Sequence, residues 1–169
     1  MKAKANNSLL PCLFLNESEY KLIMQNVKTR KNAREILFFA IYISDLLKKW
    51  DFDIDKFDLL ISSSEIELKL NDGDKNFIVN YYLKIKLNLE KIDNLIKKNL
   101  KKWDFSRINC VERSLLRIGV YELKFESIDH KIAINESVEI AKKYGEEKTS
   151  KFINGVLANV IKIDVVETA

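Results

Sequence analysis

The chain has 169 residues, a formal net charge of +4 and 47% hydrophobic residues, which suits one globular domain or two small subdomains sharing a core. A single proline and four glycines exclude a turn-rich β protein and favour long helices. The mild positive charge permits a nucleic-acid partner without requiring one, so that prediction depends on where the basic residues lie.

Residues 1–24 are predicted to form a poorly ordered leader. Their apolar run, residues 9–15, follows a basic start as in a signal peptide, but it is short, contains Pro11 and precedes no small-residue cleavage site. No later stretch is apolar over the roughly 20 residues that a membrane span needs. We therefore expect a cytoplasmic protein with no membrane segment, in which residues 1–23 are dispensable and Met24 is a candidate for the true start.

Helical periodicity dominates the rest of the chain. Residues 30–50 are predicted to form the first helix, and the nearly unbroken apolar stretch 36–43 indicates burial on several sides. Further along, the expected segments are an acidic linker at 51–55, a short helix near 56–70, a turn at 71–74 and a long helix over about 75–100.

Three more helices are predicted near the C-terminus. Ser106 is the expected N-cap of a helix over 107–125, and Gly145 is the expected stop of the next helix, 131–145. The last helix, 149–162, carries an apolar stripe at helical spacing but has Gly155 in its middle. Because no convincing strand is found, the predicted fold class is all-α, with about six or seven helices.

Catalytic and metal sites are not expected. The single histidine, His130, cannot be combined with other residues into a catalytic set, and no glycine-rich loop could cradle a phosphate. The acidic stretch 51–58 resembles the start of a calcium loop but has Lys56 and Ser62 where that loop needs glycine and glutamate. Cys12 and Cys110 are expected to be two reduced thiols. Binding is therefore the predicted type of function.

Two patches could bind a partner. Arg30, Lys31 and Arg34 share one helix face, and phosphates favour both the arginine fork and a helix N-terminus; the alternative is a solvated, charged helix start. Tyr42 falls within about 20° of the side of Lys31 and could contact a partner or pack in the core. The second patch has two lysines to neutralise phosphates and a ring to stack on a base or to join the core: Lys148, Lys151 and Phe152.

The segments "VERSLLRIGVYEL" and "KIAINESVEIAKKYGEEKTSKFINGVL" resemble the NusB family of transcription antitermination factors, and "RKNAREILFFAIY" resembles the arginine-rich start of that family. The resemblance covers about residues 25–162, although about 48–105 match only in helical character. It implies an all-helical fold of two small packed bundles, over 25–102 and 103–169. Asn32 stands where the family often has another arginine.

The resemblance also implies a function without catalysis or cofactor. NusB-like proteins bind boxA, a short single-stranded RNA of ribosomal RNA leaders, beside a small-subunit ribosomal protein that acts as the factor NusE, within the antitermination complex of RNA polymerase. Carried over by position, the RNA contacts would be Arg30, Lys31, Arg34, Lys151 and Phe152, and the protein contacts would be Tyr42 and Glu112. Lys148 joins the predicted RNA contacts only through its spacing to Lys151 and Phe152.

Several alternatives stay open. The chain could be a self-associating scaffold that binds only protein, or an RNA-binding domain related to ribosomal RNA methyltransferases, and either a monomer or a homodimer. Gly155 is expected to permit close helix packing, together with the mid-helix Gly119; the alternative is that it exposes backbone beside Phe152.

Overall fold

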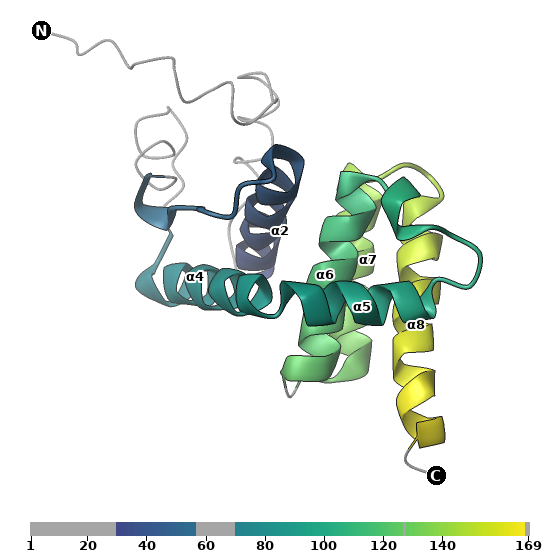
Figure 1. The fold of residues 1–169 in the computed structure, drawn as a ribbon. Helices are drawn as coiled ribbons and strands as arrows, with labels where there is room; N and C mark the ends of the chain where they lie inside the picture. Colours follow the sequence, from purple (N-terminus) through teal and green to yellow (C-terminus); the bar gives the residue numbers. More distant parts are fainter. Residues whose placement is uncertain (1–29, 57–69, 127, 168–169) are drawn as a thin grey trace, which may run out of the picture. The chain divides into compact units, whose positions relative to one another are not determined.

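The computed structural model describes residues 30–56, 70–126 and 128–167 (Figure 1). These residues form α-helices and one short 3₁₀ helix and contain no strand, so the predicted all-α class is confirmed for them. They fall into two compact units, one ending at Val79 and the other beginning at Asn80. The predicted leader, Cys12 and most of the short helix expected near 56–70 lie outside the described residues.

The first helix, α2, spans Arg30–Leu47. Most of the apolar run predicted over 36–43 is buried: every residue from Ile36 to Ile41 is at most 6% exposed, whereas Tyr42 and Ile43 are half-buried. The helix ends where Lys48 takes a left-handed conformation with φ 54°, which a non-glycine residue rarely adopts. The backbone N–H of Lys49 then donates to the Ser44 carbonyl oxygen, which satisfies one of the last carbonyls of the helix.

The long helix expected over about 75–100 is two helices, α4 (Asp72–Leu87) and α5 (Leu89–Asn99). Asn88 interrupts the run, because its side-chain Nδ2 donates to the Lys84 carbonyl oxygen at 2.8 Å and so competes with the helical hydrogen bonds. The turn predicted at 71–74 is also wrong. Asn71 instead caps α4, with its Oδ1 accepting from the Asp74 N–H at 2.8 Å.

The second unit is built around α6 (Cys110–Phe125), whose residues from Ser114 to Leu123 are all buried. It packs against α5, α7 (His130–Tyr144) and α8 (Thr149–Glu167). Figure 1 shows α6, α7 and α8 running side by side, with α5 crossing them. A two-point ion pair fastens α5 to α6: Arg117 Nε and Nη2 lie 2.8 and 2.9 Å from the two carboxylate oxygens of Asp93.

The predicted boundary between residues 102 and 103 stays a prediction, and the two compact units of the structure are divided between residues 79 and 80. The sequence suggested a boundary in the loop that follows α5. However, α5 packs against α6 and α8, so the residues before that loop belong to the second unit.

The predicted helix ends are partly correct. Gly145 ends α7, where its N–H donates to the Ala141 carbonyl oxygen at 2.8 Å. Ser106 is not the cap of α6; it lies in the 3₁₀ helix η2 (Phe105–Arg107). Asn109 caps α6 instead, its Oδ1 accepting from the Glu112 N–H at 2.8 Å, because the 3₁₀ turn delays the start of the helix.

Candidate RNA-binding and partner-binding sites

The basic start of α2 is only partly described. The side chains of Arg30 and Lys31 lie outside the described residues. Arg34 is half-buried, with its guanidinium carbon 5.6 Å from the centre of the Phe77 ring of α4. Such a cation–π contact holds the side chain in place while the guanidinium keeps its charge. The phosphate contacts assigned to these three residues stay a prediction.

Tyr42 lies toward the end of α2. It is half-buried, and its ring centre is 6.0 Å from that of Phe38, a residue of the core. Tyr42 therefore packs on the core and also keeps part of its surface exposed. Tyr42 belongs to the first unit and Glu112 to the second, and the role of both in partner binding stays a prediction.

Glu112 lies half-buried in the first turn of α6. The structure adds a contact that the sequence did not indicate. Glu112 Oε1 lies 3.3 Å from the hydroxyl oxygen of Thr149, which donates to it from the first residue of α8. Thr149 itself is only 1% exposed. Glu112 therefore connects the starts of α6 and α8.

The second predicted patch lies at the start of α8, where Lys148 and Lys151 are exposed. Phe152 is half-buried and is not part of the core, so the alternative of core burial is wrong. Its ring instead meets the indole of Trp103, with ring centres 5.9 Å apart and an edge-on angle of 69°. Trp103 is 63% exposed, an unusual position for a tryptophan on the surface of a small domain.

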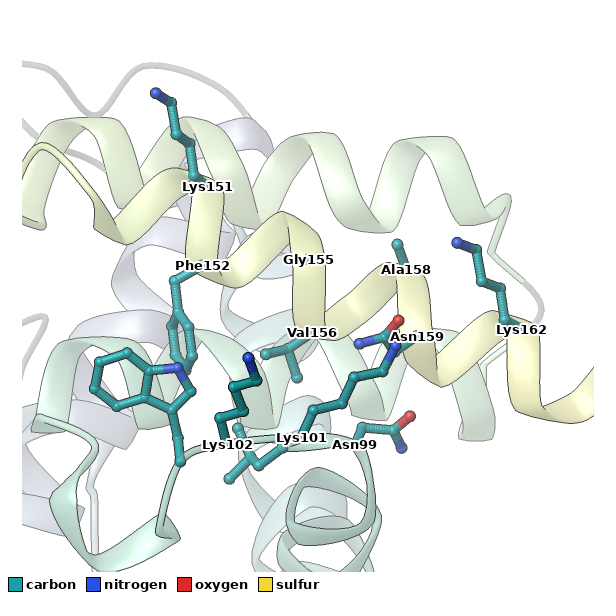
Figure 2. A pocket seen from close by; sticks show the side chains of 12 residues that line it. Asn99, Lys101, Lys102, Lys151, Phe152, Gly155, Val156, Ala158, Asn159 and Lys162 are labelled. Atoms are coloured by element: carbon teal, nitrogen blue, oxygen red, sulfur yellow. The ribbon is translucent and has the colours of Figure 1, made fainter.

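These two rings border a groove between α8 and the loop that follows α5, which we call the α8 groove. Its volume is about 450 Å³. Figure 2 shows Phe152, Val156 and Asn159 on the side of α8 that faces the loop, with Lys101 and Lys102 reaching toward them. The lining residues are Asn99, Leu100, Lys101, Lys102, Trp103, Lys151, Phe152, Gly155, Val156, Ala158, Asn159 and Lys162.

The lining of the α8 groove is basic, with four lysines and no carboxylate. The positive end of the α8 helix dipole adds to this potential near Lys148. Such a lining can attract phosphates, while the aromatic rings offer faces to unpaired bases. Lys101, Lys102 and Trp103 were not among the residues predicted from the sequence, although a lysine pair followed by tryptophan is visible there.

Gly155 does not serve close packing. A Cβ atom placed on it would have nothing within 4 Å, since this position faces the open α8 groove. Of the two mid-helix glycines, only Gly119 is closely packed, because an added Cβ would come within 2.6 Å of Leu157 Cδ1. The expectation that Gly155 packs closely with Gly119 is therefore wrong, and the alternative of exposed backbone beside Phe152 fits the structure.

The described residues give no support for a metal site or for a helix that could span a membrane. No group of three or more potential metal ligands occurs among them. None of the helices they form is long and apolar enough to cross a membrane. His130 is an exposed residue at the start of α7.

Comparison with known proteins gives consistent results. Residues 31–162 match the NusB family. A transcription antitermination protein NusB from Bacillus cereus (strain B4264) is 38% identical over 134 residues, which are 78% of this chain and 95% of that protein.

Two solved structures are similar to this chain. NusB from T. maritima superimposes with a TM-score of 0.65 at 31% identity, covering 80% of this chain and 92% of that one. The antitermination factor NusB, solved with NusE and double-stranded RNA, gives a TM-score of 0.65 at 32% identity, covering 79% and 96%.

Proposed function

Because this chain belongs to the NusB family, we propose that it is a transcription antitermination factor that binds boxA-like single-stranded RNA of ribosomal RNA leaders together with NusE, a small-subunit ribosomal protein. The matched relatives are antitermination proteins, and one similar structure contains both NusE and RNA. The protein would act in the cytoplasm within the RNA polymerase antitermination complex, by binding and without catalysis.

The α8 groove is the observation that carries the RNA part of this proposal. It combines four lysines with two aromatic rings, of which Trp103 is mostly exposed. Lysines neutralise phosphates, and exposed rings stack on bases that are not paired, which is the usual way in which proteins hold single-stranded RNA. In this proposal Lys151 and Phe152 contact RNA at the groove, and Lys148 contributes at the start of α8.

Arg30, Lys31 and Arg34 would add phosphate contacts from the start of α2. The cation–π contact of Arg34 with Phe77 supports a fixed position for one of these charges. Fixed charges bind phosphates with a smaller loss of side-chain entropy than free ones.

Tyr42 and Glu112 would contact NusE. Both are half-buried, so packing fixes one part of each side chain while the other part stays exposed, as in a preformed protein interface. Glu112 is held by Thr149 and can present its carboxylate to a basic group of the partner.

A titration with boxA-like RNA, with and without NusE, tests the proposal. We expect binding that weakens with salt, because phosphate contacts release counterions, and that strengthens when NusE is present. Binding to NusE without any salt-dependent binding to RNA would instead indicate a scaffold that binds only protein.

A further inference from the structure

We propose that the α8 groove accepts one unstacked nucleobase and that Asn159 and Asn99 read its edge. The favoured bases are adenine and cytosine, which carry an amine at the position where guanine and uracil carry a carbonyl oxygen. This inference rests on the proposed RNA-binding function and deepens it. It assigns base selection to two residues that the sequence analysis did not single out.

The space for the base comes from Gly155. This residue lines the groove, and a Cβ added to it would meet nothing within 4 Å. Phe152, three residues earlier, and Asn159, four residues later, lie on the same side of α8 in Figure 2. A base lying against Gly155 would therefore have an aromatic ring at one end and a side-chain amide at the other.

Asn159 has an amide that is available to a ligand. The residue is half-buried on the wall of the groove, and its side chain makes no hydrogen bond with the residues that the structure describes. An asparagine amide has a carbonyl oxygen that accepts and an NH₂ that donates, so it can pair with an amine and the adjacent ring nitrogen of one base.

Asn99 supplies a fixed acceptor. It is 5% exposed, and its Nδ2 donates to the Leu95 carbonyl oxygen at 2.8 Å, which sets the orientation of the amide. Its Oδ1 is buried and has no hydrogen-bond partner, although it belongs to a residue that lines the groove. A buried acceptor without a partner favours a ligand that brings an N–H to it.

Adenine and cytosine bring such an N–H on their amine, whereas guanine and uracil place a carbonyl oxygen at the corresponding position. A carbonyl there would oppose the Asn99 oxygen with a second acceptor. Lys101 and Lys102 reach over the groove in Figure 2 and are exposed, so they can swing outward to the phosphates as the base enters.

The experiment measures the affinity of the full chain for boxA-like RNAs in which each adenine in turn is replaced with purine and each cytosine with 2-pyrimidinone. Both replacements remove only the exocyclic amine. We expect a single position at which the loss weakens binding by about threefold to tenfold, the value of a hydrogen bond. The variant Asn159→Ala should bind more weakly and should respond less at that position, because only the Asn99 acceptor then contacts the amine.

Asn154→Ala is the matched control, because Asn154 is an exposed asparagine of the same helix that does not line the groove. It should respond like the unchanged protein, and circular dichroism should show the same helix content in all three proteins. The inference is overturned, and the proposed function kept, if RNA binds but no position responds, or if Asn159→Ala responds fully. A complete lack of salt-dependent RNA binding would overturn both.

Discussion

The two sides of helix α8 differ in their surroundings: one is packed against other helices and the other borders the α8 groove. On one side, Leu157 is fully buried and fills the space left by Gly119 of α6, and Thr149 donates to Glu112. On the other side, Phe152 and Gly155 border a groove lined by lysines. The first side holds the second unit together, and the second side is available to a ligand.

The two mid-helix glycines show what this difference teaches. Each costs its helix about 0.5–1 kcal/mol relative to alanine, so each needs a compensating role. Gly119 is compensated by packing, because a methyl group there would overlap Leu157. Gly155 has no such neighbour, and in the proposal made above a ligand of the α8 groove takes this space. The predictions below test this division, from the largest expected effect to the smallest.

Glu112→Lys tests whether Glu112 belongs to the packed side or to a protein interface. We expect it to weaken NusE binding by about 2–5 kcal/mol, as when an interfacial charge loses its mate. RNA binding by the protein alone should change little, because Glu112 does not line the α8 groove. Calorimetric titration with NusE and filter binding with RNA measure the two effects.

Glu112→Gln is the matched control, since its amide oxygen can still accept from Thr149 without a charge. If the lysine variant unfolds while the glutamine variant is stable, Glu112 has a structural role in joining α6 to α8. In that case the assignment of Glu112 to the partner surface is wrong.

The combined change of Arg30, Lys31 and Arg34 to alanine tests whether RNA binding depends on the start of α2 as well as on the α8 groove. Three lost phosphate contacts should lower the salt slope of RNA binding by about 0.7 each and the affinity by up to about a hundredfold near 0.1 M salt. The fold should survive, because the buried stretch of α2 begins after these residues, apart from Asn32 and Ala33.

A variant with the same loss of charge elsewhere provides the comparison. Lys86, Lys91 and Lys98 are exposed on α4 and α5 and do not line the α8 groove. Changing these three to alanine should leave the slope nearly as it is. Equal slopes for both triple variants would show that general charge, and not the start of α2, sets the RNA affinity.

Gly119→Ala should destabilise the packed side. Its Cβ would lie 2.6 and 2.8 Å from the two Cδ atoms of Leu157, which is fully buried and has little room to move. Overpacking of this kind costs about 1–3 kcal/mol, and the gain in helix propensity returns about 0.5–1 kcal/mol. We expect a net loss of about 1–2 kcal/mol in the free energy of unfolding by urea.

The double variant Gly119→Ala with Leu157→Val checks the cause, because the smaller side chain withdraws the atoms that clash. It should be more stable than the sum of the two single changes predicts. Additive effects would mean that Leu157 is not what requires glycine at position 119.

These two glycines also show where prediction from the sequence ends. The helices α2, α6 and α8 were predictable, because their apolar residues recur at helical spacing and that pattern is local. Whether a glycine meets a side chain or open space depends on a neighbour that is distant in the chain. Gly119 and Leu157 are on different helices, and no pattern in the sequence pairs them.

The same reason explains which site residues were missed. Phe152 could be proposed from its helix and from the family resemblance. Asn99 and Trp103 acquire a role only because packing of α5 against α8 brings the end of α5 and the loop after it close to Phe152. The break at Asn88 was missed as well, since a single asparagine inside a helical pattern is compatible with a continuous helix.

Gly155→Ala should have the smallest and most informative effect, because stability and binding should move in opposite directions. With open space around the added methyl group, the helix gains propensity, and the free energy of unfolding should rise by about 0.5–1 kcal/mol. The same methyl group occupies the place proposed for a base, so RNA affinity should fall. Asn154→Ala, at the neighbouring exposed position outside the groove, should leave RNA affinity unchanged. Urea unfolding measures stability and RNA titration measures affinity for both variants. If Gly155 has a packing role, the stability of Gly155→Ala should fall. If Gly155 is a surface position without a function, RNA affinity should stay the same. Greater stability together with weaker RNA binding is the result that only an open groove with a ligand in it explains.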